Sequence, residues 1–412
     1  MLSATLSAQQ RANIIEAYGS TGDPGTDAPY PLITIAKPEK EILTIPAKSS
    51  SSRTLSIEKY PGLLNDSNAI AKLAENLIKK GGVCCVILNT VKQAQDVYSA
   101  IRLSVEEKLL FHSRFKASDR EEITEKVLSF FGKRSTERPS KFILVATQVV
   151  EQSLDVDFDH MISAIAPIDL LLQRSGRMHR HYKRSYNPTL HVLLPDTESL
   201  DFGGTGKVYA TKPLLRTLAI LSEINEIHLP QDFRMLIERC YGTATWEQQA
   251  VSWEPIKKAD KEWEEDKALL SAQARQFSLC APKNRMFLPV NNEPVGDDSD
   301  DGNGWRAKTR LGASDYTTIL VKEEEIEQLS HGVLPMEEVR KRYQESLKLP
   351  GYIPLQNPSQ GYKPAVKAEG RLRGVILLPL ENNGYWQAAD ERNNHFDITY
   401  NKELGIIIRR WQ

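Results

Sequence analysis

The sequence predicts an α/β protein built on a parallel sheet with helices packed against it. Three apolar runs, "VCCVILNT" (83–90), "KFILVATQ" (141–148) and "HMISAIAP" (160–167), are typical of strands buried on both faces. Stretches with helical spacing alternate with these runs, and this alternation indicates parallel strands joined by right-handed crossovers. A fourth run, "LHVLLP" (190–195), extends the predicted sheet.

The remaining elements follow from spacing and from turn residues. "LITIA" and "EILTI" are predicted as short strands between two turn-rich segments, 19–31 and 48–52. Helices are predicted for 67–82, where Gly81-Gly82 supplies the stop, and for 118–131. Beyond residue 210 the pattern is mainly helical, and it becomes mixed after about 306. "RGVILLPLENNGYWQA" predicts a hairpin that turns at Asn382-Asn383-Gly384.

Composition narrows the class of protein. A chain of 412 residues with 40% hydrophobic residues can bury the cores of two or three soluble domains. The formal net charge is −1, so an anionic partner must be met by a local basic patch. The four cysteines form no C-x-x-C pair, which disfavours a zinc site or a disulfide framework. Neither a membrane-spanning run nor a signal-peptide pattern occurs, so we expect a cytoplasmic protein without a membrane partner.

The segment "QRSGRMHRH", which begins at Gln173, spaces three arginines at intervals of three. Arginine is costly to bury, so such a series indicates an anion nearby. On a helix Gln173, Arg177 and Arg180 would share one face. Gly176 would let a backbone or a phosphate approach closely. Arg174 is predicted either to form a structural ion pair or to act on the ligand, and the sequence leaves both open.

These motifs resemble those of superfamily 2 helicases. "QRSGRMHR" resembles motif VI, Q/H-R-x-G-R-x-x-R, and "VATQVVEQSLDVDFD" resembles motif V. "ILNT" and "FHSRF" are similar to motifs IV and IVa, and "SATL" (3–6) to motif III. Together with "LPGYIPL", the motif V and VI pair is most similar to the CRISPR-associated helicase–nuclease of type I systems. The resemblance covers most of the chain and is weaker beyond residue 210.

The resemblance implies a motor with two RecA-like domains. Such a motor moves along single-stranded DNA at the expense of ATP, after recruitment by a CRISPR RNA-guided surveillance complex, and it normally carries an N-terminal HD nuclease. We therefore expect a RecA-like sheet flanked by helices, then a helical linker and a small mixed C-terminal domain. The expected division is a remnant of the first RecA-like domain with its linker (1–30), a second RecA-like domain (31–210), a helical linker (211–290) and a C-terminal accessory domain (291–412).

The resemblance also assigns roles to nucleotide-facing residues. Arg177 and Arg180 match the catalytic arginine fingers that reach the γ-phosphate of ATP. Gln173 and Gly176 would lie beside that nucleotide. Asp155 matches the acidic residue that accepts a hydrogen bond from the nucleotide ribose, although a surface turn would also suit an aspartate.

Three further residues match positions that contact nucleic acid. Thr90 and Thr147 end predicted strands and would donate to phosphates of single-stranded DNA, although threonine also favours strands for its β-propensity. Arg114 lies in "FHSRF", which resembles a loop that contacts the DNA backbone. No metal site is expected at His160, His179 and His181, because the basic face must remain available to phosphate.

The sequence lacks the parts of the ATP site that grip the phosphates. It contains neither a Walker A loop, G-x-x-x-x-G-K-[ST], nor a Walker B carboxylate pair, and no adjacent His-Asp pair of the nuclease type. "GGTGKVY" (203–209) follows no predicted strand and has Val208 after its lysine, so an ordinary loop is predicted. "GDDSDDGNG" (296–304) lacks the final glutamate of a calcium loop and is predicted as an acidic loop.

Two functional classes remain open from the sequence. In one, the chain is the back half of an ATP-dependent DNA helicase, and a separately encoded front half supplies the Walker motifs and Mg²⁺. In the other, the chain is an inactive fragment that binds nucleic acid or the surveillance complex. A reading frame directly upstream that ends in a Walker B motif would favour the first class.

Overall fold

The computed structural model divides the chain into two compact units. One unit comprises Met1–Phe111 with Glu125–Trp263, and the other comprises His112–Thr124 with Glu264–Gln412. The structure describes residues 6–20, 30–37, 41–48, 52–151, 154–182, 184–242, 253–276, 315–332, 334–355, 362–381, 384–390, 392 and 394–411.

A seven-stranded sheet organises the first unit, in the order β5-β6-β4-β7-β8-β3-β9. All of its neighbouring strands are parallel except the edge strand β9, which pairs antiparallel to β3. This confirms the predicted parallel α/β sheet. The strands are β3 (Arg53–Tyr60), β4 (Gly82–Ile87), β5 (Lys108–Phe111), β6 (Lys141–Ala146), β7 (His160–Ala164), β8 (Thr189–Leu193) and β9 (Glu226–Leu229).

Two inner strands of this sheet, β4 and β6, are buried on both faces. Every residue of 83–88 and of 142–146 is fully buried, as the continuous apolar runs predict. Phe131, Phe142 and Phe158 pack edge-on and tilted beside it, with ring centroids 5.6 Å and 5.2 Å apart. Burial on both faces leaves the polar residues of β4 and β6 at the ends of these two strands.

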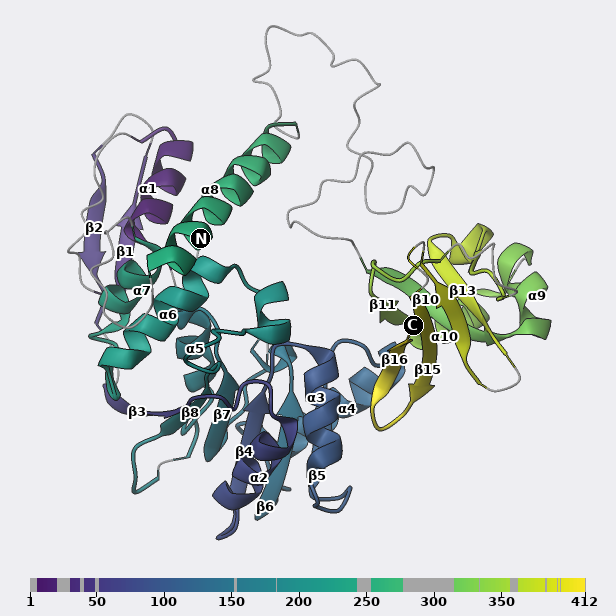
Figure 1. Cartoon of the computed structure of the whole chain (residues 1–412), viewed down its shortest axis with the longest axis horizontal. Helices are drawn as coiled ribbons and strands as arrows, with labels where there is room; N and C mark the ends of the chain where they lie inside the picture. The colour runs from purple at the N-terminus through teal and green to yellow at the C-terminus, as the bar shows by residue number, and fades with distance from the viewer. Residues whose placement is uncertain are drawn as a thin grey trace, which may run out of the picture. The chain divides into compact units, whose positions relative to one another are not determined.

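Two groups of helices pack against the sheet (Figure 1). The first contains α2 (Ser67–Leu77) and α3 (Val91–Ala100), whose N-termini are capped by Asp66 and Thr90. The second contains α5 (Ile168–Ser175), α6 (Thr211–Glu223) and α7 (Phe233–Tyr241). The helix α4 (Ala117–Phe131) precedes β6, and α8 (Trp253–Gln276) is a long, charged helix.

The stretch 211–290, predicted as a helical linker, also contributes a strand. Its β9 adds the seventh strand to the sheet by pairing with β3, and no strand is predicted there from the sequence. Near the N-terminus, α1 (Ala8–Ala17) precedes a two-stranded antiparallel ribbon of β1 (Leu32–Ile35) and β2 (Leu43–Pro46). The two short strands predicted there are confirmed.

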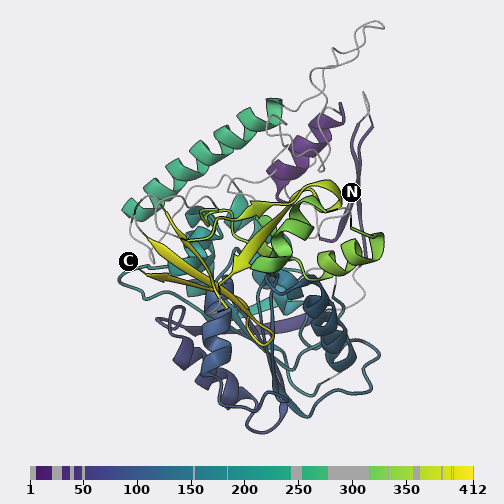
Figure 2. The same ribbon diagram turned by 90° about the vertical axis from the view of Figure 1, so that its right-hand side faces the viewer.

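The second unit contains two small sheets. One has the strand order β11-β10-β13-β12 and the other the order β14-β15-β16, in which β15 and β16 form the long hairpin seen in Figures 1 and 2. The strands are β10 (Tyr316–Lys322), β11 (Leu347–Leu349), β12 (Val366–Lys367), β13 (Val375–Leu380), β14 (Trp386–Ala389), β15 (His395–Asn401) and β16 (Gly405–Trp411). Its short helices are α9 (Ile326–His331) and α10 (Met336–Gln344).

The predicted hairpin around residues 382–384 is wrong. The amide of Gly384 donates to the carbonyl of Glu381 at 2.9 Å, and the predicted turn residues Asn382 and Asn383 lie outside the described residues. However, β13 pairs with β10 and β12, whereas β14 pairs with β15 in the other sheet. Both edges of β13 are already paired with β10 and β12, so β14 cannot pair with it and begins the other sheet. Residues 375–379 are all buried, as expected for a central strand.

The buried side chain of His112 links the loop that precedes α4 to the β15–β16 hairpin within the second unit. The Nε2 atom of His112 lies 3.0 Å from the carbonyl oxygen of Leu404, and the amide of Arg114 donates to its Nδ1 atom at 3.1 Å. The ring stacks on Phe115, with centroids 4.4 Å apart. Because Nδ1 accepts a hydrogen bond, Nε2 carries the proton and the imidazole is neutral. Burial lowers the pKa of His112 to about 4.

Acidification is therefore expected to loosen this unit. An unfolded histidine titrates near pH 6.5, so stability contributed by neutral His112 is lost as the pH falls from about 6.5 to about 4. The loss approaches 3 kcal/mol at the lower end. Hydrogen exchange at the amide of Ile406, which donates to the carbonyl of Arg114, measures this opening.

His112→Gln keeps a donor toward Leu404 and cannot titrate, so the protection factor of the Ile406 amide, which is the intrinsic exchange rate divided by the observed rate at each pH, is expected to vary less over this pH range. His228→Gln is the matched control, because the side chain of His228 is 62% exposed. An identical pH profile in the wild type and in His112→Gln contradicts the prediction.

Candidate functional site

The motif residues converge at the carboxyl ends of β4, β6 and β7. The central strand β4 pairs with both β6 and β7 in parallel, so the segments that follow all three strands leave the same edge of the sheet. Asn89 and Thr90 follow β4. The 3₁₀ helix η1 (Gln148–Val150) follows β6, and α5 follows β7.

Arg174 joins these strand ends from within the core. Its side chain is fully buried, and it forms an ion pair with Glu151, whose side chain is only 6% exposed. A guanidinium this enclosed has no exposed surface for a ligand, so the geometry favours the structural ion pair of the two roles that the sequence left open. It donates to five oxygen atoms: Glu151 Oε1 (2.7 Å), Ser163 Oγ (2.8 Å), Ala164 O (3.0 Å), Asn89 Oδ1 (3.0 Å) and Tyr209 OH (3.2 Å).

The "GGTGKVY" segment completes this polar network. Residues Gly203–Lys207 form the 3₁₀ helix η2, and β8 has ended ten residues earlier at Leu193. Thr205 Oγ1 accepts from the side chain of Asn89 at 3.0 Å. A Cβ atom at Gly204 would lie 2.8 Å from the methyl group of Thr90, so the glycine allows this close packing. The segment therefore covers strand ends instead of forming a phosphate loop, which would need a strand leading into it.

The expectation that Gln173, Arg177 and Arg180 share one helical face is wrong. The helix α5 ends at Ser175, so only Gln173 is helical, and it is partly exposed. Gly176 has φ −60° and ψ −10°, an ordinary conformation, and a Cβ atom there would lie 3.0 Å from the carbonyl oxygen of Gln173. This glycine therefore relieves crowding where the helix ends.

Arg53 of β3 explains why the helix stops at this point. Its guanidinium donates to the carbonyls of Met178 (2.8 Å) and Ser175 (3.0 Å), which are oxygens that a continuing helix would use. Burial, together with the charge of Arg180, lowers the pKa of Arg53. The sequence analysis missed this residue, because its partners lie more than 120 residues away and no local pattern marks it.

Arg177 is half-buried and held by backbone carbonyls. It donates to the carbonyls of Leu154 and of Glu151, the latter at 2.8 Å. Among the described residues these contacts use two of the five N–H groups of a guanidinium. Burial, with the nearby charge of Arg180, lowers the pKa of Arg177. The side chain is thus fixed along the motif V segment while it retains donors for a ligand.

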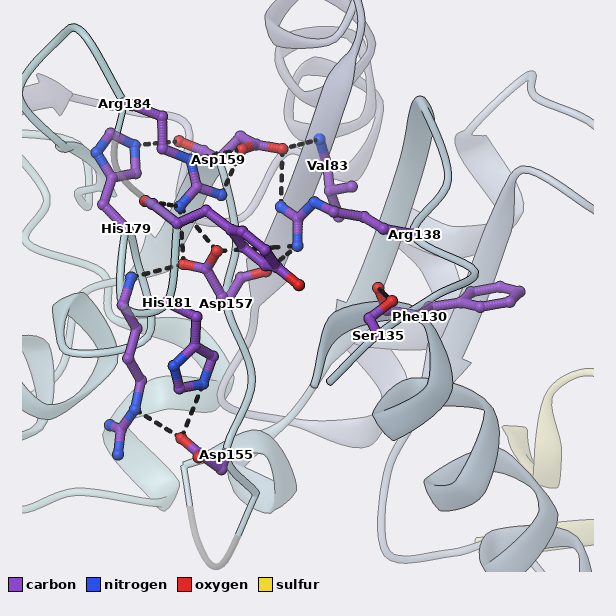
Figure 3. Close-up of polar contacts among 12 residues, drawn as sticks. Val83, Phe130, Ser135, Arg138, Asp155, Asp157, Asp159, His179, His181 and Arg184 are labelled. Carbon is purple, nitrogen blue, oxygen red and sulfur yellow. Dashed lines mark hydrogen bonds and ion pairs between the residues drawn. The ribbon is translucent and has the colours of Figure 1, made fainter. Parts of the chain in front are cut away.

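Arg180 and Asp155 meet at the surface. Their side chains are 42% and 52% exposed, and Arg180 Nε lies 2.7 Å from Asp155 Oδ1. His181 Nε2 lies 3.0 Å from the same oxygen (Figure 3). The structure therefore brings together two residues that the sequence assigned to the nucleotide, although 25 positions separate them.

The three predicted nucleic-acid contacts lie in different surroundings. Thr147 is 4% exposed, and its amide donates to the carbonyl of Phe111 at 3.1 Å. Thr90 is partly exposed, and its hydroxyl accepts from the amide of Gln93. Arg114 belongs to the second unit, is partly exposed, and its carbonyl accepts from Ile406. Their binding to nucleic acid stays a prediction.

Within the described ranges, no group of three or more His, Cys, Asp or Glu side chains is arranged to hold a metal ion. Nor is any described helix both long enough and apolar enough to cross a bilayer. The acidic segment 296–304 and residues 3–5 of "SATL" lie outside the described residues.

Comparison with known protein families points to one group. The family described as "CRISPR-associated nuclease/helicase Cas3, C-terminal" matches residues 80–183, which include β4 to β7 and the arginine segment. The CRISPR-associated endonuclease/helicase Cas3 of Thermus thermophilus is 28% identical over 99% of this chain and 50% of its own length. That of Escherichia coli K12 is 34% identical over 59% of this chain and 29% of its own length. The chain thus spans half or less of these relatives.

Solved structures show the same architecture. A crystal structure of a CRISPR-associated protein matches 99% of this chain and 47% of its own chain, with 25% identity and a TM-score of 0.76. The Cas3–AMPPNP structure of T. fusca matches 98% of this chain and 50% of its own, with 23% identity and a TM-score of 0.71. A chain in a CRISPR RNA-guided surveillance complex captured before nicking matches with 23% identity and a TM-score of 0.69, over 98% of this chain and 52% of its own.

The buried network predicts a large stability cost for losing Arg174. Arg174→Met keeps much of the volume but leaves Glu151 and the strand-end oxygens without their donor, so the free energy of unfolding should fall by about 3–5 kcal/mol. Arg174→Lys should recover little, because an ammonium cannot reach five oxygens arranged around a planar fork. Urea denaturation measures this cost. Arg134→Met, at an exposed position, should change stability by less than about 0.5 kcal/mol.

Proposed function

We propose that this chain, which carries a Cas3-like C-terminal domain and resembles the C-terminal portion of Cas3 helicase–nucleases along nearly its whole length, forms one side of the ATP site of a DNA helicase. The relatives are named as endonuclease/helicases, which supports a helicase-family enzyme. The observation that carries the proposal is the meeting of Arg180 and Asp155 at an exposed edge, next to Arg177.

The positive charges of Arg177 and Arg180 at this edge suit the phosphates of a nucleoside triphosphate. Phosphoryl transfer needs positive charge where the γ-phosphate departs, and guanidinium groups supply it without losing a proton. Arg177, held along the motif V segment, would act as one finger and Arg180 as the other. Gln173 lies four positions before Arg177 and Gly176 lies directly before it, and both would line the same edge.

The ion pair between Arg180 and Asp155 would be exchanged when nucleotide binds. A salt bridge this exposed contributes only about 0–1 kcal/mol, so a phosphate with several charged oxygens competes with it readily. Release of Arg180 to the phosphate would free Asp155 to accept a hydrogen bond from the ribose. One exposed pair would thus provide both of the nucleotide contacts.

The phosphate-binding loop and the Mg²⁺ carboxylates would come from a second RecA-like domain, because this sequence contains neither. Similarity to T. fusca Cas3 bound to AMPPNP supports ATP as the nucleotide. Similarity to a chain in an RNA-guided surveillance complex supports that complex as a partner. The division into RecA-like domain, linker and accessory domain given for the sequence would place the motor function in 31–210.

ATP turnover tests the two arginines. This chain alone is expected to hydrolyse no ATP, and turnover should appear when a RecA-like domain bearing the Walker motifs is added. In that mixture Arg177→Ala and Arg180→Ala should each lower kcat by about 10³-fold, because the lost charge stabilises the transition state. Arg177→Lys and Arg180→Lys should rescue poorly, since they lack the planar fork.

The control for this experiment is Arg134→Ala, which removes an exposed arginine elsewhere in the same unit. It should leave kcat unchanged, and melting curves should show that every variant remains folded. Normal turnover by folded Arg177→Ala and Arg180→Ala would refute their assignment as fingers. Robust turnover by this chain alone that is lost in Lys207→Ala would refute the need for a second domain.

Binding of single-stranded DNA tests the other three residues. We expect weak, sequence-independent binding that declines with salt, with a slope of log K on log [salt] of about −0.7 per charged phosphate contact. Arg114→Gln should reduce that slope by about 0.7. Thr147→Val should lower affinity without changing the slope, because a hydroxyl releases no counterion. Tight binding at high salt, or binding that depends on base identity, would contradict this assignment.

A further inference from the structure

We propose that Asp157, held in place by Arg184, is a positioning residue for the arginine finger Arg180, a proposal that rests on the function proposed above. Asp157 is fully buried, so it touches no substrate. Its Oδ1 atom accepts a hydrogen bond from the backbone amide of Arg180 at 2.6 Å. A carboxylate thus holds the peptide unit from which the finger extends.

Hydrogen bonds from the segment 157–159 also fix the backbone that leads to Arg180. The amide of Phe158 donates to the carbonyl of Arg177 at 3.0 Å, and the amide of His179 donates to the carbonyl of Phe158 at 3.2 Å. His179 has φ 49°, a left-handed conformation that is sterically costly for a residue with a side chain. Such a conformation persists only where its surroundings enforce it, and here the segment 157–159 does so.

Arg184 links the positioning carboxylate to a second one. Its Nη1 atom lies 3.0 Å from Oδ1 and 2.7 Å from Oδ2 of Asp157, and its Nε and Nη2 atoms donate to Asp159 Oδ1 at 2.9 Å and 2.6 Å (Figure 3). Arg138 donates to the carbonyl of Asp157 at 2.8 Å and to Asp159 Oδ2 at 3.0 Å. Tyr182 lies beside both guanidinium groups, at 5.4 Å and 5.8 Å. Two positive and two negative charges therefore balance within the cluster.

The two carboxylates of the cluster have different tasks. Asp159 accepts from the amide of Val83 at 2.8 Å, so it fastens the cluster to the start of β4. Burial alone would raise the pKa of Asp159, but the bonds from Val83, Arg184 and Arg138 outweigh it and lower that pKa. Within the part of the chain that the structure describes, the carboxylate of Asp159 makes no hydrogen bond to the backbone of Arg177–Arg180, whereas that of Asp157 does. Removing one charge from each residue in turn separates positioning from general support of the fold.

The chemistry of an amide makes Asp157→Asn informative. Oδ1 of Asp157 accepts hydrogen bonds from the amide of Arg180 and from Arg184 Nη1, and Oδ2 lies 2.7 Å from the same Nη1 atom as an ion-pair contact without a hydrogen bond. An asparagine has one oxygen and one NH₂ group, so its NH₂ group would face either the Arg180 amide or the Arg184 guanidinium. Either the Arg180 peptide or its Arg184 support moves. Asp159→Asn removes the same charge from the same cluster without that conflict at Arg180.

A double-mutant cycle in the reconstituted ATPase tests the proposal. Asp157→Asn should lower kcat about tenfold or more with little change in the KM for ATP. The reason is that a displaced Arg180 stabilises the transition state less, while the binding of ATP in the ground state changes little. In an Arg180→Ala background, Asp157→Asn should cause less than a twofold further loss, because the finger that it positions is already gone. Asp159→Asn should lower kcat less than threefold, and by the same factor in both backgrounds.

Each result has a separate meaning. Normal turnover by Arg180→Ala would refute the proposed function itself, whatever Asp157 does. If Arg180→Ala is impaired but Asp157→Asn causes an equal loss in both backgrounds, the positioning role is refuted while the finger stands. Should Asp157→Asn fail to fold, Arg184→Lys serves instead, because a single ammonium cannot hold both carboxylates, and the same coupling to Arg180→Ala is expected.

Discussion

The ion pair between Arg174 and Glu151 in the buried network is the interaction on which the site depends. A guanidinium buried without acceptors would cost several kcal/mol, and this one is tolerated because carboxylate, amide, hydroxyl and carbonyl oxygens surround it. Asn89 follows β4, Glu151 follows β6 and Ser163 lies at the end of β7, so one side chain fixes the relative positions of three parallel strand ends. The segments that carry the surface arginines start from these fixed ends. Rigidity in the core thus sets the geometry at the edge.

Burial decreases from Arg174 to Arg177 to Arg180, and the ability of each arginine to exchange its partner for a ligand increases in the same order. Arg174 is enclosed, Arg177 is half-buried among carbonyls, and Arg180 is exposed beside Asp155. An enclosed ion pair cannot exchange its partner without leaving a buried charge, whereas an exposed pair exchanges at little cost. The same residue type therefore provides a structural link, a fixed donor and an exchangeable donor within seven positions.

Much of this fold could be predicted from local patterns, and the failures have a common cause. The apolar runs that became β4, β6 and β7 report burial on both faces, which a single strand reveals in its own sequence. By contrast, β9 joins the sheet through β3, some 170 residues earlier, and β13 finds its partners in β10 and β12 instead of across its own turn. Which distant strands pair depends on which strand edges in the folded sheet are still unpaired. A short local stretch of sequence does not contain that information.

The site shows the same division between local and distant information. The spacing of Gln173, Arg177 and Arg180 correctly marked a segment that meets Asp155, but it implied a helix that ends too early to carry them. What ends that helix is Arg53, and what orders the following turn is Asp157, and both act from other parts of the chain. A motif thus identifies which residues take part, while buried residues outside it determine their directions. The positions of Arg177 and Arg180 therefore depend on buried charged residues such as Arg174 and Asp157.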